Sequence, residues 1–242
     1  LFRSKGRARS ACWRAFYGKH HTVSFKEGVI MQTFIDKYGA KLLTAIGQHI
    51  VYVVISVLIA AVIGLALAVF LSRFRKAAGI IMPLVSVFPT IPGIVFIGVL
   101  MLKMGMTLWT VLTALSIYAV FPILKNSYQG FLNIDQSFME VARGCGMNRW
   151  QMFWRVEFPM ALPAIFSGIR MSLIYTVSWA ILAAMIGQGG LGEFIYRGID
   201  ANVKEYIVIG SVPIAVLAVL FRLVIDKIEK ICVSKGLQED ES

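Results

Sequence analysis

The sequence predicts an all-α polytopic membrane protein with about five transmembrane helices. Of the 242 residues, 58% are hydrophobic and only 15% are charged, and the apolar residues gather in long windows that carry no charge. Ordinary soluble domains have about 45 to 50% apolar and about 25% charged residues. No segment has the composition of a separate soluble domain, so the lipid bilayer is the expected solvent for most of the chain.

Five charge-free windows are candidates for spans, since crossing a bilayer takes about 20 apolar residues. The first covers residues 42–72, and the fifth has only 16 residues but is followed by amphipathic RLVIDKIEK, which can extend its helix. Charged residues bound the remaining windows. The second lies between Lys76 and Lys103, the third between Lys103 and Lys125, the fourth between Arg170 and Glu193, and the fifth between Glu205 and Arg222.

Loop charges predict that the N-terminus lies outside and the C-terminus inside, because Lys and Arg favour cytoplasmic loops. This orientation places Arg73, Arg75, Lys76 and residues 125–170 inside. The outer loops then carry few basic residues.

Residues 1–30 form a basic leader with a net charge of +6 and no apolar signal region. Lys26-Glu27-Gly28 can be encoded by AAG-GAG-GGN, which is similar to a bacterial ribosome-binding site just before Met31. One hypothesis is therefore that translation starts at Met31 and that residues 31–242 are the native membrane domain. The other is a native basic tail, which would oppose the predicted topology.

Composition and motifs favour no enzyme, cofactor site, metal site or nucleic-acid partner. The net charge of +11 suits the loops of a membrane protein, and the chain has no G-x-x-x-x-G-K-[ST] phosphate loop and no convincing nucleophile and base pair. The cysteines and histidines have no metal-ligand spacing; they are Cys12, Cys145, Cys232, His20, His21 and His49.

Gly187, Gly189 and Gly192 have the G-x-G-x-x-G spacing of a dinucleotide site. That site needs a strand before the glycines, whereas these follow a membrane helix on the predicted outer side. Gly189 and Gly190 are instead expected to break the helix at membrane depth, where irregular backbone must be buried in protein or line a cavity.

The second window is also expected to be broken, because PLVSVFPTIPGIVF contains three prolines. Broken helices often border substrate paths in transporters, although a simple packing kink is an alternative. The candidate pathway residues at the two breaks are Pro89, Pro92, Trp179, Gln188, Gly189 and Gly190.

Residues 131–170 are too polar to span and too apolar for a solvated linker. Asp135 is expected to cap a helix through Ala142 that Gly144 and Gly146 stop, and a second helical stretch is expected from near Trp150 to before Pro159. Outward apolar side chains on such a loop favour a partner, although a helix at the headgroup boundary is an alternative.

The spacing in this loop resembles the E-A-A-x3-G-x9-I-x-L-P loop of ABC importer permeases. Glu140-Val141-Ala142 is followed by Gly146 and, nine residues later, by Val156-Glu157-Phe158-Pro159. The departures Val141, Val156 and Phe158 are exchanges between apolar residues. The resemblance implies a coupling helix that docks on a separate ATPase subunit, with site residues Glu140, Val141, Ala142, Gly146 and Pro159.

Across residues 42–225 the chain resembles the osmoprotectant branch of these permeases, which transports glycine betaine, carnitine and choline. There a G-A-G-G-L-G stretch closes the fourth of the windows described above, and Gln188 stands here in place of Ala. The resemblance implies a methionine-permease-like fold in a bacterial cytoplasmic membrane. It also implies three kinds of partner: ABC ATPase subunits, a second permease copy or paralogue, and an extracellular substrate-binding protein.

Two alternative functions remain open from the sequence. One is an ABC permease for methionine or another amino acid, and the other is an ion-coupled secondary transporter, for which His49 is the candidate ionisable residue. If the substrate is a quaternary cation, aromatic faces in the spans could attract it, or they could simply pack. These aromatic residues are Phe88, Phe96, Tyr118, Phe121, Tyr175 and Trp179.

Overall fold

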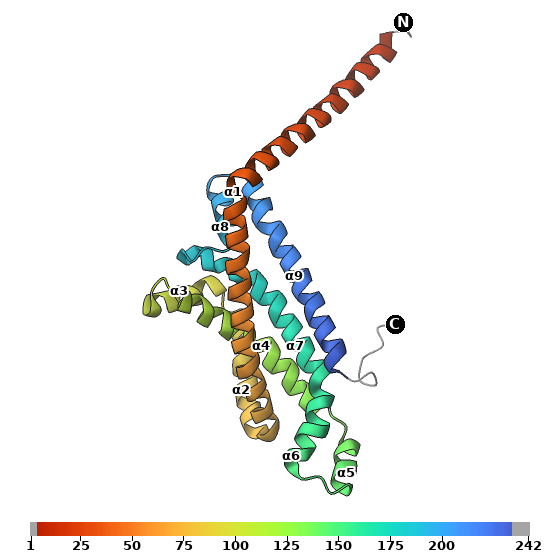
Figure 1. Ribbon diagram of the computed structural model, residues 1–242, viewed down its shortest axis with the longest axis vertical. Coiled ribbons are helices and arrows are strands. Elements are labelled where there is room, and N and C mark those ends of the chain that lie inside the picture. The colour runs from red at the N-terminus through yellow and green to blue at the C-terminus, as the bar shows by residue number, and fades with distance from the viewer. Residues whose placement is uncertain (1–3, 234–242) are drawn as a thin grey trace. The chain divides into compact units, whose positions relative to one another are not determined.

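The computed structural model describes the backbone of residues 4–233 and the side chains of residues 39–233 (Figure 1). The chain divides into two units, Leu1–Thr44 and Ala45–Ser242. Throughout the described backbone every regular element is a helix. The side chains around the predicted start at Met31 lie outside the described residues.

The described residues contain nine α-helices, and short segments of other helix types lie between some of them. The α-helices are α1 (Ser4–Arg73), α2 (Arg75–Val87), α3 (Gly93–Met104), α4 (Leu108–Leu132), α5 (Gln136–Gly144), α6 (Arg149–Met152), α7 (Phe158–Trp179), α8 (Gly192–Asp200) and α9 (Lys204–Cys232). The 3-10 segments are η1 (Phe88–Thr90) and η3 (Ala180–Ile186), and a π-helical segment, η2 (Phe153–Glu157), joins α6 to α7.

Four helical segments are long and apolar enough to cross a membrane: residues 39–73, 108–132, 149–186 and 204–232. A fifth candidate is the pair made by residues 75–90 and 93–104, which is bent by 98° at the break. The prediction of about five spans is confirmed, as is the break in the second. Helix α9 continues through the amphipathic segment after Arg222, as expected.

Two predicted span boundaries are wrong. Helix α4 continues past Lys125 to Leu132, and α7 begins upstream of Arg170. Arg170 stays within the helix because its guanidinium donates to Asp226, at 2.7 Å, and to Glu229 of α9. A charged residue is a poor guide to the end of a span where it forms an ion pair, since the attraction between the opposite charges offsets much of the free energy of removing each from water.

Helices α4 and α7 pack extensively against each other in the second unit. The helices come close where small residues face each other: a Cβ added to Gly130 would lie 2.6 Å from Ala164 Cβ. The buried Ser172 hydroxyl of α7 donates to the Ala119 carbonyl of α4 at 2.9 Å. Helix α9 packs against α7 and α8 (Figure 1).

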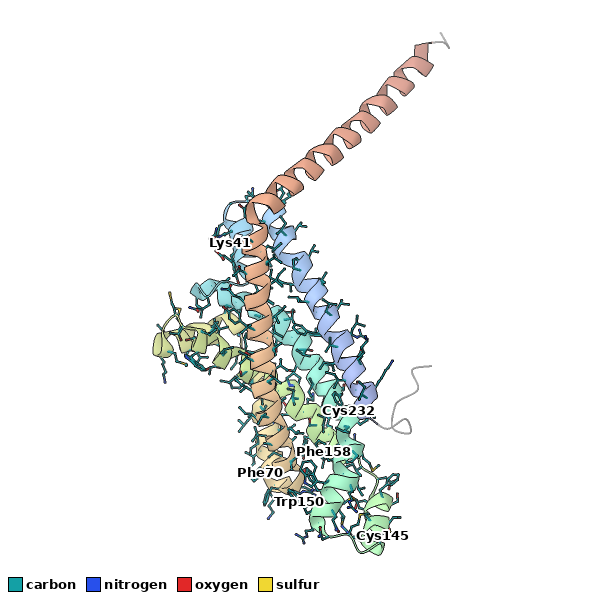
Figure 2. The ribbon with its side chains drawn as sticks, in the orientation of Figure 1. Lys41, Phe70, Cys145, Trp150, Phe158 and Cys232 are labelled. Carbon is teal, nitrogen blue, oxygen red and sulfur yellow. The ribbon has the colours of Figure 1, made fainter. Side chains whose placement is uncertain are left out.

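Large apolar side chains remain exposed along whole helices (Figure 2). On α1, Leu58 and Val62 are 61% and 72% exposed, and α9 presents Val212, Val216 and Val219 in the same way. Monomeric soluble proteins rarely expose apolar surface of this extent. These faces suit a hydrocarbon solvent or neighbouring membrane helices.

Candidate functional site

The loop between α4 and α7 begins with the helix that the sequence predicts. The Ser137 N–H donates to Asp135 Oδ1 at 2.9 Å, which caps α5. The same backbone hydrogen bond, together with one from the Ser137 side chain, lowers the pKa of the Asp135 carboxyl below its ordinary value. The cap is therefore an ionised acceptor at neutral pH.

A glycine turn ends α5, also as predicted. Gly146 has φ +75°, a left-handed conformation that other residues rarely adopt. The N–H groups of Gly146 and Met147 donate to the carbonyls of Arg143 and Ala142 at 2.9 and 3.1 Å. The next helix, α6, then starts at a capping box formed by Asn148 and Gln151.

The expected end of the second helical stretch before Pro159 is wrong, because the chain stays helical through Pro159 and into α7. The π-helical segment makes this possible. The Phe158 N–H bonds to the Phe153 carbonyl, five residues back, just before the proline that has no N–H to donate. A π-bulge of this kind is frequent at functional sites.

Helix α5 presents a partly apolar outer face. Val141 is 66% exposed and Phe138 51% exposed, one helical turn apart, and Glu140 is also exposed. Ala142 is only 3% exposed, so its side chain packs inward rather than onto this outer face. On α6 and the π-helical segment, Trp150 and Trp154 are also exposed, with ring centroids 5.6 Å apart.

An ion pair that the sequence did not reveal ties this loop to α1. Arg73 Nη1 donates to Glu157 Oε1 at 3.1 Å, and Nη2 donates to Oε2. The Glu157 side chain is 9% exposed and that of Arg73 46%. The sequence signal that could have revealed this ion pair is Glu157 itself, a single acid between the apolar residues Val156 and Phe158.

The break in the second span carries an aromatic cluster. The rings of Phe88, Phe96 and Tyr118 contact one another, and Tyr118 also stacks on Trp179 with 4.9 Å between centroids. The Tyr118 hydroxyl donates to the Ile91 carbonyl at 2.7 Å, between Pro89 and Pro92. The structure thus brings Trp179 to the two predicted proline positions.

The other two aromatic candidates do not join this cluster. The Phe121 ring lies 5.8 Å from the Lys125 ammonium, and Tyr175 is 46% exposed. Because the Tyr118 ring contacts the other three rings, part of the aromatic surface of this cluster is occupied by packing.

The second break also matches the prediction. Helix α7 tightens into η3, and Gly187, Gly189 and Gly190 then have φ of +74°, +75° and +80°. Tyr52 on α1 donates to the Gln188 carbonyl at 2.6 Å, and the Gly190 N–H donates to Gln48 Oε1 at 2.9 Å. Gln188 Nε2 reaches the Met106 carbonyl at 2.7 Å. These hydrogen bonds fix irregular backbone that would otherwise lack partners.

Removing both α1 contacts should loosen this glycine segment. For Gln48→Ala with Tyr52→Phe, we expect faster amide exchange at residues 187–190 and reduced transport, since each hydrogen bond contributes about 0.5 to 1.5 kcal/mol. Hydrogen exchange on the membrane-embedded protein measures the first effect. The control is Tyr128→Phe, because that hydroxyl makes no hydrogen bond within the described residues. Unchanged exchange in the double variant would show that α1 does not hold the segment.

His49 has a structural environment. It is fully buried, and its Nε2 lies 3.0 Å from the Val177 carbonyl, which can only accept, so Nε2 carries the proton. Helix α7 changes to the 3-10 segment η3 at Ala180, so the last carbonyls of α7 have altered hydrogen-bond partners. His49 Nε2 is the partner of one of these carbonyls, that of Val177. Among the described residues no group of three or more His, Cys, Asp or Glu could hold a metal ion.

Comparison with known proteins identifies relatives along most of the chain. The family model described as "Binding-protein-dependent transport system inner membrane component" matches residues 39–235. The glycine betaine/carnitine/choline transport system permease protein OpuCB of Bacillus subtilis is 36% identical, with 86% of this chain and 96% of the relative covered. The choline transport system permease protein OpuBB of the same organism is 34% identical, with 85% and 94% covered. The carnitine transport permease protein OpuCB of Listeria monocytogenes is 32% identical, with 86% and 95% covered.

The fold is also similar to a solved structure, an inward-facing conformation of the MetNI methionine ABC transporter. The TM-score is 0.69 at 22% identity, and the match covers 80% of this chain and 96% of that one. This likeness confirms the predicted fold, and the curated relatives confirm the family resemblance drawn from the loop spacing.

Proposed function

Because the chain belongs to the family of binding-protein-dependent transport system inner membrane components, we propose that it translocates small quaternary-ammonium osmoprotectants in an ATP-driven importer. The observation that carries the substrate class is the agreement among the relatives, which are named for glycine betaine, carnitine and choline. The likeness to the methionine transporter concerns the fold alone. The curated relatives are permeases of osmoprotectant transport systems, which does not favour the ion-coupled carrier.

The proposal assigns α5 and its glycine turn as the coupling segment that docks on a separate ATPase subunit. Its support is the exposed face with Phe138, Val141 and Glu140, together with the rigid turn at Gly146. Ala142 and Pro159 act from inside, Ala142 by packing α5 inward and Pro159 at the start of α7. A second permease copy and an extracellular binding protein complete the proposed importer.

The proposed orientation places this loop in the cytoplasm, with the N-terminus outside and the C-terminus inside. Its support is the basic character of the segments near the loop: Arg73, Arg75 and Lys76 follow the first span, and Arg143 and Arg149 flank the turn. Basic residues concentrate on the cytoplasmic side of membrane proteins.

The proposed pathway runs past the two breaks, with Pro89, Pro92 and Trp179 at one and Gln188, Gly189 and Gly190 at the other. Its support is the position of the two breaks. The proline break lies within the bent pair of helices that can form one span, and the glycine break follows directly on the span that ends at residue 186. Irregular backbone at that depth is stable only when it is buried in protein or borders a cavity.

The turn at Gly146 provides a matched pair of variants. A Cβ at Gly144 or Gly146 would meet no atom within 4 Å, but only Gly146 has a positive φ. We expect Gly146→Ala to misplace the coupling segment, since the left-handed conformation costs roughly 1 to 2 kcal/mol for other residues. Uptake and ATPase association should fall for Gly146→Ala, and further for Gly146→Leu, while Gly144→Ala stays close to wild type. Equal activity of Gly144→Ala and Gly146→Ala would contradict the assignment.

The proposed function is tested by uptake of labelled glycine betaine, carnitine and choline in cells with the importer present or deleted, at high and low osmolarity. We expect deletion to remove at least one of these fluxes. Intact fluxes together with a loss of methionine uptake would move the protein to the amino-acid alternative. The permease purified without its ATPase should hydrolyse no ATP.

A further inference from the structure

The joint between the loop and α7 is held from α1 at both of its ends. The joint is the π-helical segment Phe153–Glu157, and Arg73, the last residue of α1, contacts its first and last residues. The guanidinium carbon lies 5.6 Å from the centre of the Phe153 ring, and the guanidinium forms two hydrogen bonds with the Glu157 carboxylate.

The Arg73 guanidinium and the Glu157 carboxylate pair in a geometry that only an arginine can supply. A planar guanidinium that binds a carboxylate through two nitrogens fixes orientation as well as distance, which a lysine cannot do. The Glu157 side chain is almost buried, so little water reaches its carboxylate and Arg73 supplies the compensating charge. Arg170, the arginine of α7, is already engaged with Asp226 and Glu229.

The same end of α1 shares an apolar core with the joint. Leu71 and Ala68 of α1 are fully buried in a cluster with Ala161 of α7, and Phe153 and Phe158 pack against that cluster. Figure 2 shows Phe70, Trp150 and Phe158 at the same end of the second unit. The loop therefore contacts α1 through apolar packing and through a directional ion pair.

We propose that Arg73 and Glu157 are positioning residues that pass movement of the coupling segment to the first span. This inference rests on the proposed function, because it requires an ATPase that moves the loop. A π-helical segment is a local irregularity in an α-helix and is frequent at functional sites, so it offers a place where the angle between loop and span can change. Arg73 ties both ends of that segment to α1, and α1 in turn contacts the outer glycine segment through Gln48 and Tyr52.

The test uses the assembled complex of permease and ATPase subunits in proteoliposomes, with ATP hydrolysis measured with and without substrate-loaded binding protein. We expect Arg73→Glu and Glu157→Arg each to reduce the stimulation by loaded binding protein about tenfold, because each places like charges together. The double variant Arg73→Glu with Glu157→Arg should recover most of the stimulation. The control is Arg75→Glu, which changes a neighbouring exposed charge that has no ion pair among the described residues and should keep near wild-type stimulation.

Co-purification of the ATPase separates coupling from assembly. If a charge reversal prevents assembly, Arg73→Lys and Glu157→Gln replace it, and each should assemble but show reduced stimulation and fewer substrates transported per ATP. Wild-type stimulation in assembled single variants, or a double variant no better than the singles, overturns the inference. If loaded binding protein does not stimulate ATP hydrolysis by the wild-type complex, that result would instead contradict the proposed function.

Discussion

Replacing Val141 by Asp is expected to reduce ATP-driven uptake by roughly 30-fold or more, which corresponds to the ~2 kcal/mol or larger loss at an interface hot spot. Val141 is 66% exposed on α5, so an aspartate there meets water in the isolated permease and costs the fold little. In a complex, the carboxylate would be buried against the ATPase surface without a partner. Co-purification of the ATPase and uptake by proteoliposomes are the two measurements.

The matched control is Val141→Leu, which keeps the site apolar and of similar size and should preserve association. Glu140→Lys tests the neighbouring charge in the same assay, and it should weaken association as well. Normal assembly and transport by both Val141→Asp and Glu140→Lys would show that this face of α5 is not the docking surface.

Gly93→Ala is expected to reduce uptake about tenfold or more while the ATPase remains bound, because repacking a dense contact typically costs about 1 to 3 kcal/mol. A Cβ at this position would lie 1.8 Å from Trp179 Cζ3 and 2.3 Å from Cε3. The indole must move, and its stack on Tyr118 is then lost. Transport by the reconstituted complex, with ATPase co-purification alongside, measures the effect.

Two further variants decide whether the indole is the cause. Gly98→Ala lies on the same helix, α3, where an added Cβ meets nothing within 4 Å, and it should behave as wild type. Trp179→Phe removes the clashing part of the ring, so it should restore much of the activity when combined with Gly93→Ala. If Gly93→Ala transports as well as Gly98→Ala, the close contact between Gly93 and Trp179 has no part in the pathway.

The sequence predicted the elements whose signals are local. Asp135 as a cap and Gly146 as a turn follow from side-chain chemistry and from the lack of a Cβ, and both are confirmed. The proline-rich break and the glycine break could be placed for the same reason, since each residue type acts on its own backbone.

What the sequence missed depends on partners that are distant along the chain. Arg170 ended a predicted span because its partners Asp226 and Glu229 lie more than 50 residues away. The pairing of Arg73 with Glu157, and the contacts of Gln48 and Tyr52 with the glycine segment, have the same character. Pro159 was expected to end a helix, and the π-helical hydrogen bond that accommodates it leaves no clear mark in the sequence.

The most direct test of the account measures accumulation of labelled glycine betaine, carnitine or choline in proteoliposomes that contain the permease and its ATPase. We expect uptake only with ATP and substrate-loaded binding protein together, and its loss in Val141→Asp but not in Val141→Leu. Accumulation that proceeds without ATP, driven by an imposed ion gradient, would contradict the account and favour the secondary-transporter alternative.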